Sequence, residues 1–202
     1  MAKKNSFQQL QKKLLISMAL FSAFGITGCI APPSNTLVLA PEIVVPNQDL
    51  SVSAVSINIV SYDKRDNPVL ATIERNGQLE NLMPNRDVRF LLQEILEKQM
   101  IARGYAVGGN APINVQIILN KLNADVKEGN FRHLINASAE ITIVAGSVSG
   151  MQQSKTYRSS YNVEGPLTAS NAKIEEVLNT VLTNIVAEMS QDTSVSNFIR
   201  AR

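Results

Sequence analysis

The chain has 202 residues, of which 45% are hydrophobic and 18% are charged, and it contains no internal repeat or low-complexity run. Cys29 is the only cysteine, which excludes the disulfide framework of small exported domains, because their cysteines come in pairs. His133 is the only histidine, so a zinc site of the usual cysteine and histidine type is excluded as well.

The first 28 residues have the pattern of an export signal. The only charged residues before Cys29 are four lysines: Lys3, Lys4, Lys12 and Lys13. The 13 residues from Leu14 to Ile26 carry no charge and correspond to about 20 Å of helix, whereas the hydrocarbon core of a bilayer is about 30 Å thick. This segment is too short to span a membrane comfortably, and we predict that residues 1–28 are a signal peptide.

The signal ends in Ile26-Thr27-Gly28-Cys29, which is the lipobox pattern of bacterial lipoproteins. Small side chains at Thr27 and Gly28 fit a peptidase cleft, so cleavage is expected between Gly28 and Cys29. The Cys29 thiol can carry diacylglycerol, and its freed amine can take a further chain such as palmitate, which together make a stable anchor. The alternatives are an ordinary secretory signal with an unrelated cysteine, or a short uncleaved membrane helix.

Removal of the signal leaves 174 residues with 15 basic and 17 acidic side chains, a net charge of −2. No segment of this mature chain combines clustered Lys and Arg with aromatic residues, so nucleic acid is not an expected partner. The length is sufficient for one domain with its own core, which we place at residues 51–202.

Residues 29–50 are predicted to be a tether behind the lipidated cysteine. Four prolines fix the backbone and remove hydrogen-bond donors, so a helix or a central strand is not expected here: Pro32, Pro33, Pro41 and Pro46. Fully extended, such a tether reaches about 60 Å. Alternatively, the apolar stretch Thr36–Val45 lies along the domain as an edge strand interrupted at Pro41.

The first half of the domain begins with strands. Alternation of apolar and polar residues predicts a half-buried strand over Val52–Ile59. Asn76-Gly77 predicts a tight hairpin between Leu70–Arg75 and Gln78–Leu82. Apolar residues at helical spacing then predict an amphipathic helix that Asn85 caps and that ends at Gly104.

The second half of the domain returns to alternation. Strands are expected over Ile113–Leu119, Ile135–Ile143 and Ser154–Val163, as an antiparallel meander. Ser170 should cap a second amphipathic helix, and Asp192–Ile199 should form a short turn or helix. The predicted fold is a two-layer α+β domain, with a mostly antiparallel sheet of four to six strands and two amphipathic helices packed on one face.

No catalytic constellation, metal site or cofactor motif is apparent. His133 would have to serve as the base of any serine triad, and we expect it instead to face solvent from a strand. Phe131, Tyr157 and Tyr161 could form an aromatic patch, for which core packing is favoured over a ligand groove. The run from Asp63 to Asp66 is interpreted as a solvated loop.

Two arginines are candidates for contact with a partner. Arg86 and Arg89 lie in the first turn of the first predicted helix, where the positive end of the helix dipole favours acidic side chains such as Asp87. This mismatch suggests that Arg86 or Arg89 reaches a carboxylate elsewhere or a partner molecule.

Several motifs are distributed over the mature chain: Asn85–Glu94, Leu96–Met100, Ala102–Tyr105, Ser160–Gly165, Ala169–Asn171 and Met189–Ser194. In these motifs and in their order, the chain resembles the YajG family of proteobacterial lipoproteins. The resemblance implies an outer-membrane lipoprotein without an assigned activity, and it supplies no catalytic residues. Ile30, rather than aspartate, follows the lipidated cysteine, which favours sorting to the outer membrane of a Gram-negative cell.

The leading hypothesis is a non-enzymatic lipoprotein of the outer membrane that faces the periplasm and binds another envelope component, protein or glycan. The second is a carrier of a small ligand, such as a lipid or a cell-wall fragment, with an apolar pocket between helices and sheet. The third, least favoured, is an envelope hydrolase that depends on His133.

Overall fold

The computed structural model describes residues 35–147 and 149–201, which belong to one compact unit, Asn35–Arg202. The predicted signal peptide, its cleavage site between Gly28 and Cys29, and the lipidation of Cys29 lie outside the described residues. The elements of the unit are β1 (Thr36–Leu37), η2 (Leu50–Val52), β2 (Ser56–Asp63), β3 (Ala71–Arg75), β4 (Gln78–Pro84), α2 (Val88–Arg103), β5 (Ala106–Val107), β6 (Ile113–Glu128), β7 (Arg132–Ser147), β8 (Gln152–Pro166), α3 (Asn171–Gln191) and α4 (Ser194–Arg200).

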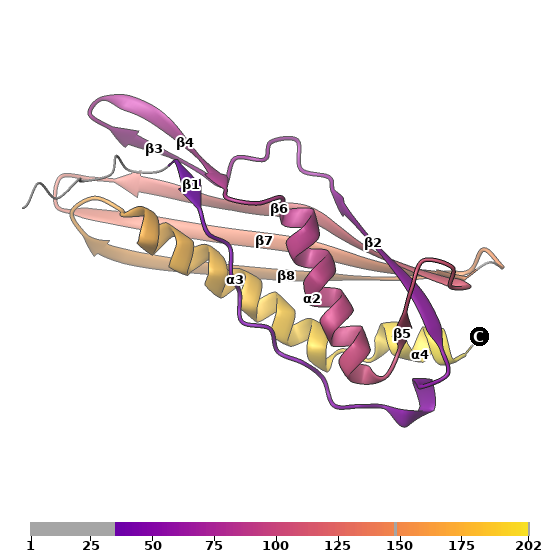
Figure 1. Cartoon of the computed structure of the whole chain (residues 1–202). Coiled ribbons are helices and arrows are strands. Elements are labelled where there is room, and N and C mark those ends of the chain that lie inside the picture. The colour runs from indigo at the N-terminus through magenta and orange to yellow at the C-terminus, as the bar shows by residue number, and fades with distance from the viewer. Residues whose placement is uncertain (1–34, 148, 202) are drawn as a thin grey trace, which may run out of the picture. The chain divides into compact units, whose positions relative to one another are not determined.

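The larger sheet has five strands in the order β5-β2-β6-β7-β8 (Figure 1). The predicted meander is confirmed, since β6, β7 and β8 pair antiparallel with their sequence neighbours. However, β2 pairs parallel with both β5 and β6, so the sheet is mixed and not purely antiparallel, and the prediction of a single sheet is wrong. The cause is the long connection through the hairpin and α2, which returns the chain to the end of the sheet where β2 began.

The predicted hairpin forms a separate sheet of three strands, in the order β1-β4-β3. Asn76 and Gly77 both have positive φ angles, 52° and 74°, as a two-residue type I′ turn requires. β3 and β4 pair antiparallel from Arg75↔Gln78 onward, and β1 adds to β4 in parallel. The fold therefore contains two mixed sheets.

The helices begin and end at residues that suit helix termini. Asp87, rather than the predicted Asn85, caps α2 by accepting a hydrogen bond from the Arg89 amide (2.9 Å). Gly104 ends α2 with a φ of 113°, and Ser170 caps α3 as predicted.

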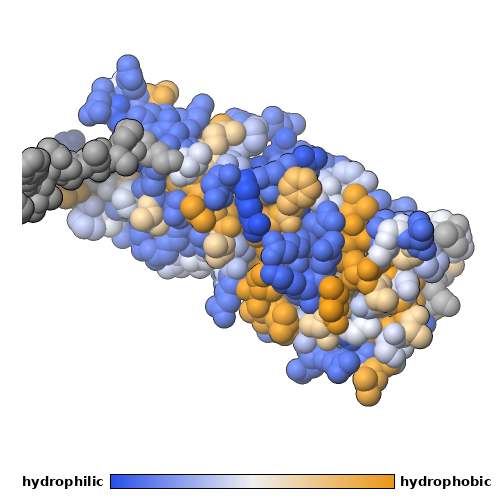
Figure 2. All heavy atoms as spheres, in the orientation of Figure 1, coloured by the Kyte–Doolittle hydropathy of each residue, from blue (hydrophilic) through white to orange (hydrophobic). Residues whose placement is uncertain are grey.

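The prediction of two helices packed together on one face of one sheet is not what the structure shows. α2 contacts mainly β2 and β5, whereas the longer α3 runs along β7 and β8, where the short α4 also packs (Figure 1). Figure 2 shows hydrophilic side chains over the outward side of α2 and over the β3/β4 hairpin. The buried stripes of α2 and α3 enter one common core.

One face of the five-stranded sheet supplies most of this core. Residues paired across the strands point to the same side, and the row Ile117↔Ile143 is at most 2% exposed. The alternate residues form the opposite side, which we call the polar face. Its members include Asn58, Asn114, Gln116, Asn120, Asn136, Ser138, Glu140, Thr142, Thr156, Arg158, Ser160 and Asn162.

The segment before β2 lies along the domain, which is the second of the two alternatives that the sequence left open for Thr36–Val45. Leu37 and Leu39 are buried, and three backbone amides donate to side chains spaced four residues apart on α3. These bonds are Val38 to Glu175 (2.9 Å), Ala40 to Asn179 (2.8 Å) and Glu42 to Thr183 (3.0 Å).

Candidate binding groove between the two sheets

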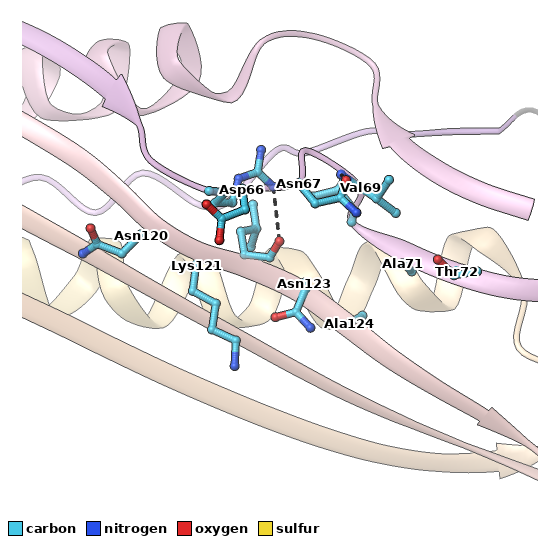
Figure 3. Close-up of a pocket in the computed structure, with 12 residues that line it drawn as sticks. Asp66, Asn67, Val69, Ala71, Thr72, Asn120, Lys121, Asn123 and Ala124 are labelled. Carbon is cyan, nitrogen blue, oxygen red and sulfur yellow. Dashed lines mark hydrogen bonds between the residues drawn. The ribbon is translucent and has the colours of Figure 1, made fainter.

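The first half of β6 pairs with β2, whereas its second half lies beside the start of the β3/β4 hairpin. β2 pairs with β6 as far as Asp63↔Leu119, and a register shift in the ladder with β7 follows immediately. Further along, the Ala124 amide donates to Leu70 at the start of the hairpin (2.7 Å). Between these two points the loop from Lys64 to Val69 passes over the edge of β6 and leaves a groove of about 360 Å³ (Figure 3).

Polar side chains from two elements line the groove. Figure 3 shows Asn120, Lys121 and Asn123 along β6, with Asp66 and Asn67 on the loop above them. Amide, hydroxyl and ammonium groups together offer hydrogen-bond donors and acceptors without a strong net charge. Such a wall can bind a polar molecule such as a polyol or a peptide.

Two of these side chains form hydrogen bonds with residues of the neighbouring strand β7. Asn120 donates to Thr142 on β7 (2.7 Å), and the Asn123 side-chain oxygen accepts from Ser138 (3.2 Å). Since Thr142 and Ser138 belong to the polar face, the groove opens onto that face. The orientation of the two amides is therefore fixed before anything binds.

Arg65 closes the back of the groove. Its side chain is 5% exposed, donates to both carboxylate oxygens of Asp63 and reaches the Leu122 carbonyl (3.2 Å). Burial acts to raise the pKa of Asp63, but hydrogen bonds and charge from Arg65 outweigh it and lower the pKa. The predicted solvated loop therefore contains a buried ion pair at its start, followed by exposed Asp66.

A second pair of the same kind lies at the start of α2. Arg89 donates to both oxygens of Asp87 through Nε (3.1 and 3.0 Å), as Arg65 does with Asp63. Hydrogen bonds from the Arg89 side chain are the main cause that lowers the pKa of Asp87. Both pairs line one further hollow of about 340 Å³.

The two arginines predicted to contact a partner are both exposed. Arg86, just before α2, lies 3.3 Å from Glu94 on that helix, and Arg89 pairs with Asp87. Each arginine therefore has a carboxylate close by, on α2 or at its N-terminal cap. Contact of Arg86 and Arg89 with a partner stays a prediction.

The expectation that His133 faces solvent is wrong. His133 is 5% exposed, and its Nδ1 lies 3.1 Å from the Leu167 carbonyl. Gly165 is directly opposite on β8, where any Cβ would lie 2.5 Å from the imidazole ring. The sequence contained this signal, because His133 is in phase with the buried residues Ile135 and Ala137.

The three aromatic residues do not share one environment. Tyr157 is 1% exposed within the core, as predicted, whereas Tyr161 and Phe131 are 40% and 83% exposed. The space between helices and sheet, where a carrier would hold its ligand, is occupied by buried aliphatic side chains.

The described residues contain neither a metal-binding group nor a membrane-spanning helix. Within the part of the chain that the structure describes, no group of three or more His, Cys, Asp or Glu residues is arranged to hold a metal ion. Among the same residues, no helix is both long and apolar enough to cross a membrane.

A solved structure shares the fold. The chain superimposes on the crystal structure of a protein from Xanthomonas campestris with a TM-score of 0.57 at 14% identity, covering 81% of this chain and 98% of that one. A more distant match is a putative neuraminyllactose-binding hemagglutinin homolog from Helicobacter pylori, with a TM-score of 0.47 at 8% identity, covering 80% and 97% of the two chains.

Sequence comparison identifies the family. Residues 41–200 match the model of a family described as uncharacterized lipoprotein. The chain is also 47% identical to the uncharacterized lipoprotein YajG of Escherichia coli K12 over 189 residues, which cover 94% of this chain and 97% of the relative. The YajG protein of Escherichia coli O6:H1 matches to the same extent. The chain therefore belongs to the YajG family of lipoproteins.

Proposed function

We propose that the mature protein is anchored by lipid on Cys29 to the periplasmic side of the outer membrane, and that its domain binds a polar envelope component without catalysing a reaction. A glycan chain is the component whose chemistry fits the groove best. The observation that carries the proposal is the groove at the β6 register shift, whose amide side chains are held in place by the polar face.

The groove favours a neutral, hydroxyl-rich ligand. Asn120 and Asn123 present amides, Thr72 presents a hydroxyl, and Val69 provides an apolar contact. Sugars offer alternating hydroxyl groups and apolar ring faces, and they bind where fixed polar groups lie beside apolar surface. The adjoining polar face continues the same chemistry with Asn, Ser and Thr, so a longer chain could extend from the groove across the strands.

Membership of a lipoprotein family supports the anchor. The lipobox ends at Cys29 and the packed unit begins at Asn35, so the domain follows its predicted anchor closely. Lipid at Cys29 would keep the groove near the envelope glycan.

Site-specific photo-crosslinking in Gram-negative cells tests the binding. A photoreactive amino acid would replace Asn67 or Lys121, which are both exposed at the rim of the groove. We expect a discrete adduct from both positions. If the ligand is cell-wall glycan, digestion with a muramidase should greatly reduce the mass of this adduct.

Lys98 provides the matched control, because it is exposed on α2 outside the groove. The same photoreactive residue at Lys98 should give no such adduct. Equal adducts from all three positions, or none from either groove position, would contradict binding at this site. An adduct that resists the muramidase and is removed by a protease would replace the glycan with a protein partner.

A further inference from the structure

Three connections of the domain lie together at one end. The Ala124 amide of β6 donates to the Leu70 carbonyl, which fixes the start of β3 beside β6. Beyond this bond, residues of the hairpin between Thr72 and Leu79 line one pocket together with Val126 and Glu128 of β6. β3 and β6 thus run on side by side, which brings the Asn76-Gly77 turn level with the β6–β7 turn. The β8–α3 loop joins them, because the Leu167 amide donates to the Phe131 carbonyl (3.0 Å). We call this the turn end (Figure 1).

The first strand of the described unit, β1, is oriented with its N-terminal end toward the turn end. β1 is parallel to β4, with Thr36 opposite Met83, and β4 begins at Gln78 beside the hairpin turn. The N-terminal end of β1 therefore faces the hairpin turn along β4. The five residues from Met83 back to Gln78 correspond to about 17 Å of strand.

The length of chain available limits how far the turn end can be from the membrane. Cys29 precedes Asn35 by six residues, which span at most about 20 Å. This reach is hardly longer than the distance from Met83 to the hairpin turn. A lipid attached at Cys29 therefore holds Asn35 within about 20 Å of the bilayer surface, a distance at which the turn end can reach that surface.

The turn end exposes large apolar side chains. Phe131, Leu79 and Leu167 are 83%, 77% and 68% exposed, and they are three of the four most exposed large apolar residues that the structure describes. Removing such a side chain from water is favourable, and that free energy is not gained while the side chain stays exposed to water. A lipid interface provides it, since aromatic and leucine side chains are favoured there.

Backbone geometry holds one of these side chains outward. Leu167 has a φ of 57°, a left-handed conformation that is unfavourable for a residue with a side chain. The hydrogen bond between the buried His133 ring and the Leu167 carbonyl helps to keep the loop in this conformation. His133 thus has a positioning role at the turn end.

The charges beside Phe131 are balanced. Arg132 lies 3.5 Å from Glu164, and Lys127 lies 3.7 Å from Asp125. A surface of this kind is attracted to lipid through its apolar side chains and not through net positive charge.

We propose that the turn end rests on the lipid surface, with Phe131, Leu167 and Leu79 inserted into the interfacial layer. This contact would fix the orientation of the domain on the membrane. The proposal depends on the anchor at Cys29 that the proposed function includes.

The absence of tryptophan from the sequence gives a direct test. Phe131→Trp would create a single fluorescent reporter at the turn end. Leu50→Trp is the matched control, because Leu50 is 75% exposed but lies beside the C-terminal end of α2, next to Asp49, whose amide donates to the Arg103 carbonyl. The lipidated proteins would be purified from membranes and inserted into vesicles of phosphatidylethanolamine and phosphatidylglycerol, with and without brominated acyl chains.

We expect the emission of the Phe131→Trp protein to shift to shorter wavelength and to be quenched by the brominated lipids, whereas Leu50→Trp is unchanged. Vesicles that carry both proteins but quench neither would overturn the membrane contact and leave the anchor intact. A blue shift without quenching would indicate burial against protein and would also overturn it. Proteins that fail to float with the vesicles would overturn the anchor itself. Leu167→Trp should behave like Phe131→Trp.

Discussion

The two faces of the five-stranded sheet are built from the same strands but differ in what covers them. On the buried face, Ile117, Ile143 and Tyr157 are at most 2% exposed and contact the common core. On the polar face, their neighbours Gln116, Thr142 and Arg158 form hydrogen bonds or ion pairs at the surface or remain partly exposed. Stability therefore depends mainly on one face, and the other can carry a binding surface at little cost to the fold.

The two faces should differ most in how much the free energy of unfolding falls when a side chain is truncated, and the neighbouring residues Ile143 and Val144 test this. Ile143→Ala removes a buried side chain from the core and should lower the free energy of unfolding by about 2–5 kcal/mol. Val144→Ala, on the polar face, should cost only about 1 kcal/mol, because the side chain is already partly exposed. Urea denaturation followed by circular dichroism measures both. Equal losses would mean that the polar face is also packed.

Glycines on opposite faces of the β7–β8 ladder give the next comparison. Gly165→Ala places a Cβ 2.5 Å from the buried His133 ring, and we expect a loss of about 1–3 kcal/mol. Gly146→Ala on the polar face meets Gln152 at 3.6 Å, an ordinary contact, and should be neutral within about 0.5 kcal/mol.

The double variant Gly165→Ala, His133→Ala identifies the cause of that loss. Removal of the ring makes room for the new Cβ, so the combined loss should be smaller than the sum of the two single losses. Additive losses would show that the clash with His133 is not the reason.

Acid should lower the free energy of unfolding by protonating Asp63, which forms an ion pair with Arg65 at the end of β2. Despite burial, hydrogen bonds and charge from Arg65 lower the pKa of Asp63 below its ordinary value of 3.8. A carboxyl group with a lower pKa in the folded state contributes stability above its unfolded pKa and loses it as the pH falls through the folded pKa. The free energy of unfolding should therefore fall from about pH 5 downward, and less steeply in Asp63→Asn. An unchanged pH dependence in the variant would exclude Asp63 as a source.

The smallest effect is expected on the polar face. Arg158 donates to Glu140 at 2.6 Å, but its side chain is 68% exposed. Exposed ion pairs contribute little, so Arg158→Ala should lower the free energy of unfolding by less than about 1 kcal/mol. A larger loss in thermal or urea unfolding would contradict the view that this face is dispensable for folding.

Local sequence signals predicted the elements better than their partners. Asn76-Gly77 located the hairpin, Ser170 located the start of α3, and alternation located the meander. Alternation in β2 indicates a half-buried strand but carries no information on direction, so its parallel pairing was missed. The sequence places the cap of α2 at Asn85 instead of Asp87, because Asn and Asp side chains are both able to accept a capping hydrogen bond from a backbone amide.

The candidate groove was not predicted, although the sequence contains a trace of it. Apart from Ile118, the buried residues of β6 occupy odd positions as far as Leu119 and even positions from Leu122 onward. This change of phase marks the register shift beside which the groove lies. The loop that forms the other wall comes from a distant part of the chain, and no local pattern indicates that it crosses there.

The proposed orientation on the membrane depends most directly on the lipid at Cys29. Mass spectrometry of the N-terminal fragment of the protein, extracted from the membranes of Gram-negative cells, measures this modification. We predict a fragment that begins at Cys29 and carries both a diacylglycerol group and an amide-linked acyl chain. A fragment that retains residues 1–28, or that begins at an unmodified Cys29, would contradict the anchor and with it the proposed orientation on the membrane.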